Sequence, residues 1–251
     1  MKAAAAAALL VGLGAAALAD DAPLVLQQLS CRGEAPAWSI EANATTALAA
    51  GVRGEAIHSG VLGTLGAPAW AVFDGAELTL VARAETCSLG GELFDHVALA
   101  LWGDGTRASG CCRARIGIDL GAAPLADLAG KPAADWSRLA LDLEAVLRAC
   151  VIDGGVAVER VAMAWPMNHG LALARLVDGA GGRHDCIADI ATGRIERVAP
   201  VAEAERMPGE DAPGFWPARE APPLFTCGWV EALPTAGGHL LGWLHYGGPC
   251  G

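Results

Sequence analysis

The chain has few charged residues, few aromatic residues other than tryptophan, and none of the short motifs that mark common enzyme families. A G-x-S-x-G nucleophile elbow, an H-E-x-x-H metal motif, a P-loop and a G-x-G-x-x-G dinucleotide motif are all absent. The six histidines never occur at the i, i+2 or i, i+4 spacing of a metal-binding face, and no two cysteines form a C-x-x-C pair. The local sequence therefore predicts no catalytic or metal centre and implies no cofactor.

Basic side chains are scarce. Charged residues make up 18% of the 251 residues, and 28 acidic residues outnumber 17 basic ones, for a formal net charge of -11. Nucleic acids and anionic lipids both bind clusters of basic side chains, so the composition excludes them as partners. Hydrophobic residues reach 53%, which predicts a folded chain with one large core or two small ones.

A long apolar run occurs only at the N-terminus. Lys2 precedes the uncharged run Ala3–Ala17, and Ala17-Leu18-Ala19 has the small-x-small form of a signal-peptidase site. These features predict a signal peptide over residues 1–19 and a periplasmic or secreted protein without membrane insertion after cleavage. The alternative is a retained N-terminal anchor.

Eight cysteines follow the predicted signal, an even number that indicates disulfide bonds in an oxidising compartment. Cys111 and Cys112 are neighbours on a predicted strand, so their side chains point to opposite faces and need different partners. Cys31 and Cys87 are the two upstream candidates. The remaining cysteines pair most simply in chain order, as Cys150–Cys186 and Cys227–Cys250.

The predicted fold class is mainly β with an α+β part. Residues 20–118 predict a small β-barrel or sandwich, because short alternating strands are separated by glycine turns. Trp38, Ile40 and Ala42 share one face of a predicted strand. Residues 96–102 and 106–116 flank Gly103-Asp104-Gly105, which predicts a hairpin.

Residues 119–134 are rich in alanine, glycine and proline and predict a linker. Residues 135–251 predict an α+β domain that ends in a disulfide hairpin. Asp135 is expected to cap a helix over 136–150, and this helix is expected to lie across one face of an antiparallel meander. The meander strands are predicted at 156–165, 170–177, 184–190 and 194–200, followed by a loop over 203–223.

The segment Cys31-Arg32-Gly33-Glu34-Ala35-Pro36-Ala37-Trp38-Ser39 resembles the C-G-x-E-P-F-W-S-like opening of an uncharacterised family of bacterial envelope proteins and lipoproteins. In that family a cysteine precedes a strand pair and a G-C or G-C-C step closes the domain, similar to Cys87 and Gly110-Cys111-Cys112 here. The similarity covers about residues 31–115. It departs from the pattern at Ser88–Gly91, where the family has Met, Ser and Asp. The resemblance implies a lipocalin-like barrel and an envelope location, without an established activity.

His184-Asp185-Cys186 contains the residue types of a thiol nucleophile system. Adjacent residues on a strand alternate faces, so the three side chains cannot converge locally. A disulfide at Cys186 is therefore favoured over a functional thiol. The predicted strand connection Trp165–Gly170 is a candidate binding loop, with Trp165, Asn168 and His169 as its binding residues. The competing interpretation is a hairpin turn with Trp165 packed in the core.

Two further features have both a structural and a functional interpretation. Acidic residues gather at Glu203, Glu205, Glu210 and Asp211 around Arg206, a pattern that predicts a solvated loop more than a calcium site. A groove over the first domain, if barrel-like, is suited to a small apolar ligand.

These observations favour an exported, disulfide-stabilised binding or inhibitor-like envelope protein, whose partner is an unidentified envelope protein or a small ligand. One alternative is a hydrolase-type enzyme with a site assembled by the fold, using His169 or His184. Another is a structural component that acts under envelope stress.

Overall fold

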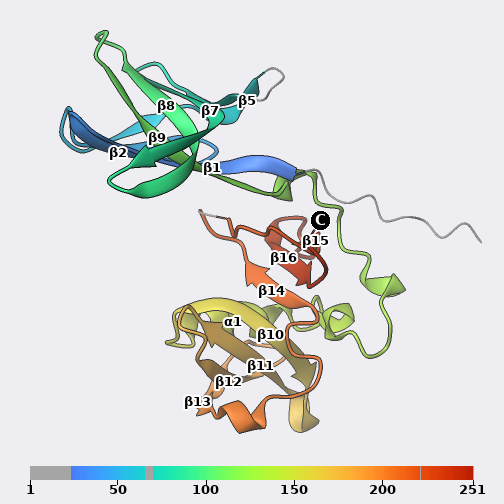
Figure 1. Cartoon of the computed structure of the whole chain (residues 1–251). Helices are drawn as coiled ribbons and strands as arrows, with labels where there is room; N and C mark the ends of the chain where they lie inside the picture. The colour runs from blue at the N-terminus through green and yellow to red at the C-terminus, as the bar shows by residue number, and fades with distance from the viewer. Residues whose placement is uncertain (1–23, 66–69, 221, 251) are drawn as a thin grey trace, which may run out of the picture.

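The computed structural model describes residues 24–65, 70–220 and 222–250, so the predicted signal peptide lies outside the described residues. The described strands form two antiparallel sheets (Figure 1), which confirms the mainly β class. Within those residues, no helix is long and apolar enough to cross a membrane.

The first sheet contains nine strands in the order β4-β3-β2-β1-β9-β8-β7-β6-β5. Its strands are β1 (Leu24–Glu34), β2 (Ala37–Ala42), β3 (Thr46–Ala50), β4 (Ala56–Ser59), β5 (Val61–Leu65), β6 (Trp70–Asp74), β7 (Leu78–Leu89), β8 (Glu92–Trp102) and β9 (Arg107–Ile118). The predicted hairpin is the β8–β9 pair, which turns at residues 103–106.

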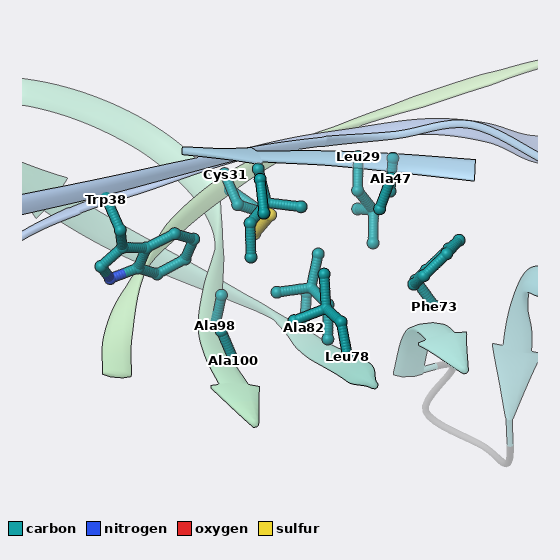
Figure 2. Close-up of a cluster of buried hydrophobic side chains, with 14 of the residues drawn as sticks. Leu29, Cys31, Trp38, Ala47, Phe73, Leu78, Ala82, Ala98 and Ala100 are labelled. Atoms are coloured by element: carbon teal, nitrogen blue, oxygen red, sulfur yellow. A yellow bond between two sulfur atoms is a disulfide. The ribbon is translucent and has the colours of Figure 1, made fainter. Parts of the chain in front are cut away.

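Alternation along these strands builds the first core. On β2, Trp38, Ile40 and Ala42 are buried, while the residues between them are exposed. The sheet bends so that side chains of β1–β3 face those of β6–β8 across a narrow apolar interior (Figure 2). Many of the interior residues are alanines, so the two layers can approach closely.

Of the two expected forms, barrel or sandwich, a closed barrel is not found. In the described part of the chain no strand ladder joins the edge strands β4 and β5. The start of β5 is instead tied to the β2–β3 turn by two backbone hydrogen bonds: the Gly60 and Leu62 N–H groups donate to the Thr45 and Ala44 carbonyls, both at 3.0 Å. The sheet therefore stays open at this edge, although it is strongly curved (Figure 1).

Two disulfides staple the first sheet. Cys31 on β1 lies directly opposite Cys112 on β9 and bonds to it, whereas Cys111 bonds to Cys87 on β7. Cys112 belongs to the core between the layers, and the neighbouring Cys111 projects from the other face. The prediction that these adjacent cysteines take different partners is confirmed.

The second sheet contains seven strands in the order β13-β12-β11-β10-β14-β16-β15. They are β10 (Val158–Pro166), β11 (Leu171–Asp178), β12 (Arg183–Asp189), β13 (Ile195–Val201), β14 (Gly214–Pro217), β15 (Trp229–Pro234) and β16 (Leu240–Tyr246). The four-strand meander and the final hairpin agree with the sequence. The short strand β14 interrupts the predicted 203–223 loop, because it fills the gap between β10 and β16.

The predicted helix over 136–150 is wrong in its first half. In the described ranges the single α-helix is α1 (Glu144–Asp153), and the earlier turn is a separate 3₁₀ helix (Trp136–Leu139) whose N-cap is Asp135. The Trp136 indole N–H donates to the Pro213 carbonyl at 2.8 Å. This contact with a distant loop orients the 136–139 turn differently from α1, so the two do not form one continuous helix.

The helix α1 lies across one face of the meander strands (Figure 1). Val146, Leu147 and Cys150 are its buried residues. Cys150 forms a disulfide with Cys186 on β12, so the bridge fastens the helix covalently to the sheet it covers. A fourth disulfide, Cys227–Cys250, closes the C-terminal hairpin as predicted.

The predicted linker over 119–134 is packed on the second sheet. Its Ala126 N–H donates to the Ala232 carbonyl of β15, and the Ala232 N–H donates to the Pro124 carbonyl. Lys131 forms an ion pair of 2.6 Å with Glu231, and both side chains are largely buried. The segment therefore extends the β15 edge of the sheet.

Candidate ligand-binding site

A recess of about 520 Å³ opens at one end of the first sheet. It is bounded by the end of β3, the 51–54 loop, the start of β4, the β6–β7 turn and the β8–β9 turn. Its volume lies within the range of small-molecule sites. The lining residues are Ala49, Ala50, Val52, Arg53, Gly54, Ala56, His58, Ala76, Glu77, Trp102, Gly103 and Asp104.

Small side chains create the space. Four of the lining residues are alanines, whose side chains end at Cβ, and Trp102 is almost fully buried beside them. The turn into the 51–54 loop depends on Gly51, which has φ of +110° and lies where a Cβ atom would be 2.3 Å from the Ala37 carbonyl. The loop therefore leaves β3 at an angle that only glycine permits.

Two pairs of a basic and an acidic side chain span the recess. Arg53 Nη1 lies 3.1 Å from Asp104 Oδ2, and His58 Nδ1 lies 3.4 Å from Glu77 Oε2. Arg53 and His58 come from the β3–β4 side, whereas the two carboxylates come from the turns on the other side. We call Arg53 and His58 the basic rim, and Glu77 and Asp104 the acidic rim.

Asp104 is held in place as a carboxylate. Its Oδ1 accepts the Thr106 N–H at 3.0 Å in the β8–β9 turn. This backbone hydrogen bond, with a smaller contribution from Arg53, lowers the pKa of Asp104 below its usual range. The turn motif that predicted the hairpin therefore also fixes a negative charge beside the recess.

His58 is the unusual residue of the recess. Its side chain is only 10% exposed, and its buried Nδ1 has no hydrogen-bond partner among the described residues. Glu77 Oε2 is near, but the contact does not have hydrogen-bond geometry. A buried polar atom without a partner costs about 1–3 kcal/mol, so native proteins retain few of them.

The predicted binding residues Trp165, Asn168 and His169 lie elsewhere, at the tip of the β10–β11 hairpin. Asn168–Gly170 forms a single 3₁₀ turn in which His169 has φ of +62°. Asn168 and His169 are exposed, and Trp165 is half-buried. The structure has the turn that the competing interpretation requires, and a binding role for these residues stays a prediction.

The side chains of His184, Asp185 and Cys186 diverge. His184 Nε2 lies 3.2 Å from Asp178 Oδ2, and Asp185 accepts hydrogen bonds from Arg175. Cys186 is bonded to Cys150 and carries no thiol. The preference for a disulfide over a functional thiol is confirmed.

The expectation of a solvated loop holds for Glu203, Glu205 and Arg206, which are exposed, but is wrong for Glu210. The Glu210 side chain is only 1% exposed. Its Oε1 lies 2.5 Å from Arg175 Nη1, its Oε2 lies 2.9 Å from Arg183 Nε, and the Met207 N–H donates to Oε1 at 2.7 Å. Sequence reasoning missed this network because Arg175 and Arg183 lie on separate strands, and nothing in their local sequence marks them as partners of Glu210.

The network controls the ionisation of Glu210. Burial alone raises the pKa of this carboxyl, but the Met207 N–H and the two guanidiniums outweigh it, so the pKa is held below its usual range. Arg160 extends the network through Asp211, with Nε 2.7 Å from Oδ1. The carboxylates thus fasten the segment after β13 to the face of the sheet opposite α1.

A pH prediction follows from the lowered pKa of Glu210. The stabilisation from its charge is complete above the ordinary glutamate pKa of about 4.3 and is lost as the pH falls through the lower folded-state value. The difference in unfolding free energy between wild type and Glu210→Gln is therefore expected to narrow between pH 7 and pH 3, measured by urea unfolding. A difference that is constant with pH would contradict this assignment.

The recess residues were visible in the sequence but carried little signal. His58 is one of six scattered histidines, and Asp104 belongs to a motif that indicated only a turn. Arg53 and Glu77 are charged residues of ordinary loops. Their assembly depends on the bend of the sheet, which brings the β3–β4 and β7–β8 sides together.

No protein-family model, curated protein or solved structure matches the chain.

Proposed function

We propose that this protein is an exported, disulfide-stabilised binding protein of the cell envelope that holds a small ligand in the recess of its first sheet. Four disulfides join all eight cysteines, which is typical of oxidising compartments. The N-terminal signal pattern and the resemblance of residues 31–115 to envelope proteins support the same location.

The observation that carries the binding role is the unpartnered His58 in the recess. A protein that needed only a stable fold gains nothing from a buried imidazole nitrogen without a partner among the described residues, here beside a recess large enough for a small molecule. A bound ligand removes this cost, because it offers a hydrogen bond to the nitrogen. The mixed lining favours a ligand with polar groups over the small apolar ligand that the sequence suggested for this domain.

The test is a thermal-shift screen of small metabolites against three proteins. Ala76→Trp fills the recess from an exposed turn position, and Ala180→Trp is the control at an exposed turn in the second sheet. At a ligand concentration 100 times Kd, binding stabilises the folded state by about 2.7 kcal/mol. We expect at least one compound to raise the Tm of wild type and Ala180→Trp without raising that of Ala76→Trp.

Two results would contradict the proposal. One is a screen in which every stabilising compound acts equally on Ala76→Trp. The other is a screen in which no compound raises the Tm of the wild type. The comparison between variants requires that both have the circular dichroism spectrum of the wild type.

A further inference from the structure

The charges around the recess are separated by side. The acidic rim lies on the β6–β7 and β8–β9 turns, which the Gly103 N–H joins by donating to the Glu77 carbonyl at 2.9 Å. The basic rim lies on the 51–54 loop and β4. A ligand in the recess therefore meets negative charge on one side and positive charge on the other.

On the acidic rim, Glu77 is the carboxylate with unused acceptors, since its contact with His58 Nδ1 at 3.4 Å is not a hydrogen bond. Asp104 already accepts the Thr106 N–H and faces Arg53. The Glu77 side chain is 83% exposed, and within the described ranges its carboxylate accepts no hydrogen bond. An ammonium group is the natural partner for such a carboxylate, since the resulting hydrogen bond is charge-assisted.

On the basic rim, Arg53 has N–H donors that its ion pair with Asp104 does not use. Its ion pair with Asp104 runs through Nη1, and its side chain is half-exposed. A guanidinium has five N–H donors arranged to hold a carboxylate through two parallel hydrogen bonds. His58, the second member of this rim, lines the recess, and its buried Nδ1 has no hydrogen-bond partner among the described residues.

We infer that the ligand is a small zwitterion with a free ammonium and a free carboxylate, such as an amino acid or a short peptide. This inference rests on the proposed function. The ligand's ammonium group faces Glu77 and its carboxylate faces Arg53, while its side chain lies against the alanines and Trp102. An uncharged ligand would displace water from the charged side chains of both rims without offering them opposite charges. Burying charged groups in this way is unfavourable.

The two charges of the ligand can be tested separately by isothermal titration calorimetry. The probes are leucine, alanyl-alanine and alanyl-leucine, with N-acetyl-alanyl-leucine and alanyl-leucine amide as blocked forms. We expect at least one free zwitterion to bind, and each blocked form to bind at least tenfold more weakly than alanyl-leucine. Comparing leucine with the dipeptides distinguishes an amino acid from a peptide.

Two variants assign each charge to its rim. Glu77→Gln is expected to weaken alanyl-leucine binding at least tenfold and to abolish the preference for a free amino group, with the preference for a free carboxylate retained. Arg53→Gln is expected to show the opposite pattern. Arg107→Gln, an exposed position on β9 outside the recess lining, is the control and should bind as the wild type does.

The inference is overturned if no free zwitterion binds, or if blocked and free forms bind equally. Its failure is distinguishable from failure of the proposed function. An uncharged compound that binds wild type but not Ala76→Trp would leave the binding function standing and reject the zwitterion. If no compound binds the wild type more strongly than it binds Ala76→Trp, both the binding function and the zwitterion are rejected.

Discussion

Glu210→Ala is expected to lower the free energy of unfolding by about 3–5 kcal/mol, because it removes one partner from a buried ion pair. The Glu210 carboxylate neutralises Arg175, whose side chain is 4% exposed, and Arg183, whose side chain is 10% exposed. Without it, both guanidiniums remain buried with fewer acceptors, and the Met207 N–H loses its partner. Urea unfolding at pH 7 measures the loss.

Two variants separate the charge from the side chain that carries it. Glu210→Gln keeps a carbonyl oxygen for the Met207 N–H but removes the charge, so its loss should be smaller than that of alanine. Glu203→Ala is the control: Glu203 also pairs with Arg183, but its side chain is 75% exposed. Exposed pairs contribute at most about 1 kcal/mol. Equal losses in Glu203→Ala and Glu210→Ala would contradict the buried network.

Hydrogen exchange adds a spatial test of the same prediction. The network joins strands β11 and β12 to the segment after β13. Glu210→Ala should therefore reduce amide protection in the second sheet and leave the first sheet unchanged, because the two sheets have separate cores.

Replacement of Cys31 and Cys112 together by alanine is expected to lower the unfolding free energy by about 4 kcal/mol. The bridge joins positions 81 residues apart, and a loop of this length restricts the unfolded chain strongly. Both cysteines are also buried in the first core, so their replacement removes packing as well. Denaturant unfolding and amide exchange in β1 and β9 measure the effect.

The comparison is the double variant Cys227→Ala/Cys250→Ala. That bridge joins positions 23 residues apart near the end of the chain, so its removal should cost less, about 3 kcal/mol. A Cys31→Ala/Cys112→Ala protein as stable as the wild type would show that β1 and β9 hold together through their hydrogen bonds and core contacts alone.

The strands were largely predictable because each carries a local pattern. Trp38, Ile40 and Ala42 on β2 repeat with the period of two that places side chains on one face of a strand. The same alternation places the side chains of the adjacent Cys111 and Cys112 on opposite faces, which predicted that they form two different disulfides. Turn residues, such as those at 103–105, located the hairpins, because their backbone preferences act over a few residues.

Predictions that depended on distant contacts were less successful. The sequence over 136–143 has a helical pattern, but the α-helix begins only at Glu144. The Trp136 side chain instead donates a hydrogen bond to the Pro213 carbonyl. Glu210 belongs to a polar segment that resembles a solvated loop, yet two arginines on other strands bury it. Local composition cannot report such contacts, since the partners are 27 and 35 residues away.

The sequence by itself determined the β class, the alternation of the strands, the hairpin turns and the need for different partners at Cys111 and Cys112, all of which follow from local periodicity and from the geometry of neighbouring residues. Only the tertiary structure decided that the first sheet stays open, that residues 119–134 pack on the second sheet, and that Arg53, His58, Glu77 and Asp104 surround one recess. Those features depend on how far a sheet bends, and the bend brings together side chains that no local pattern connects.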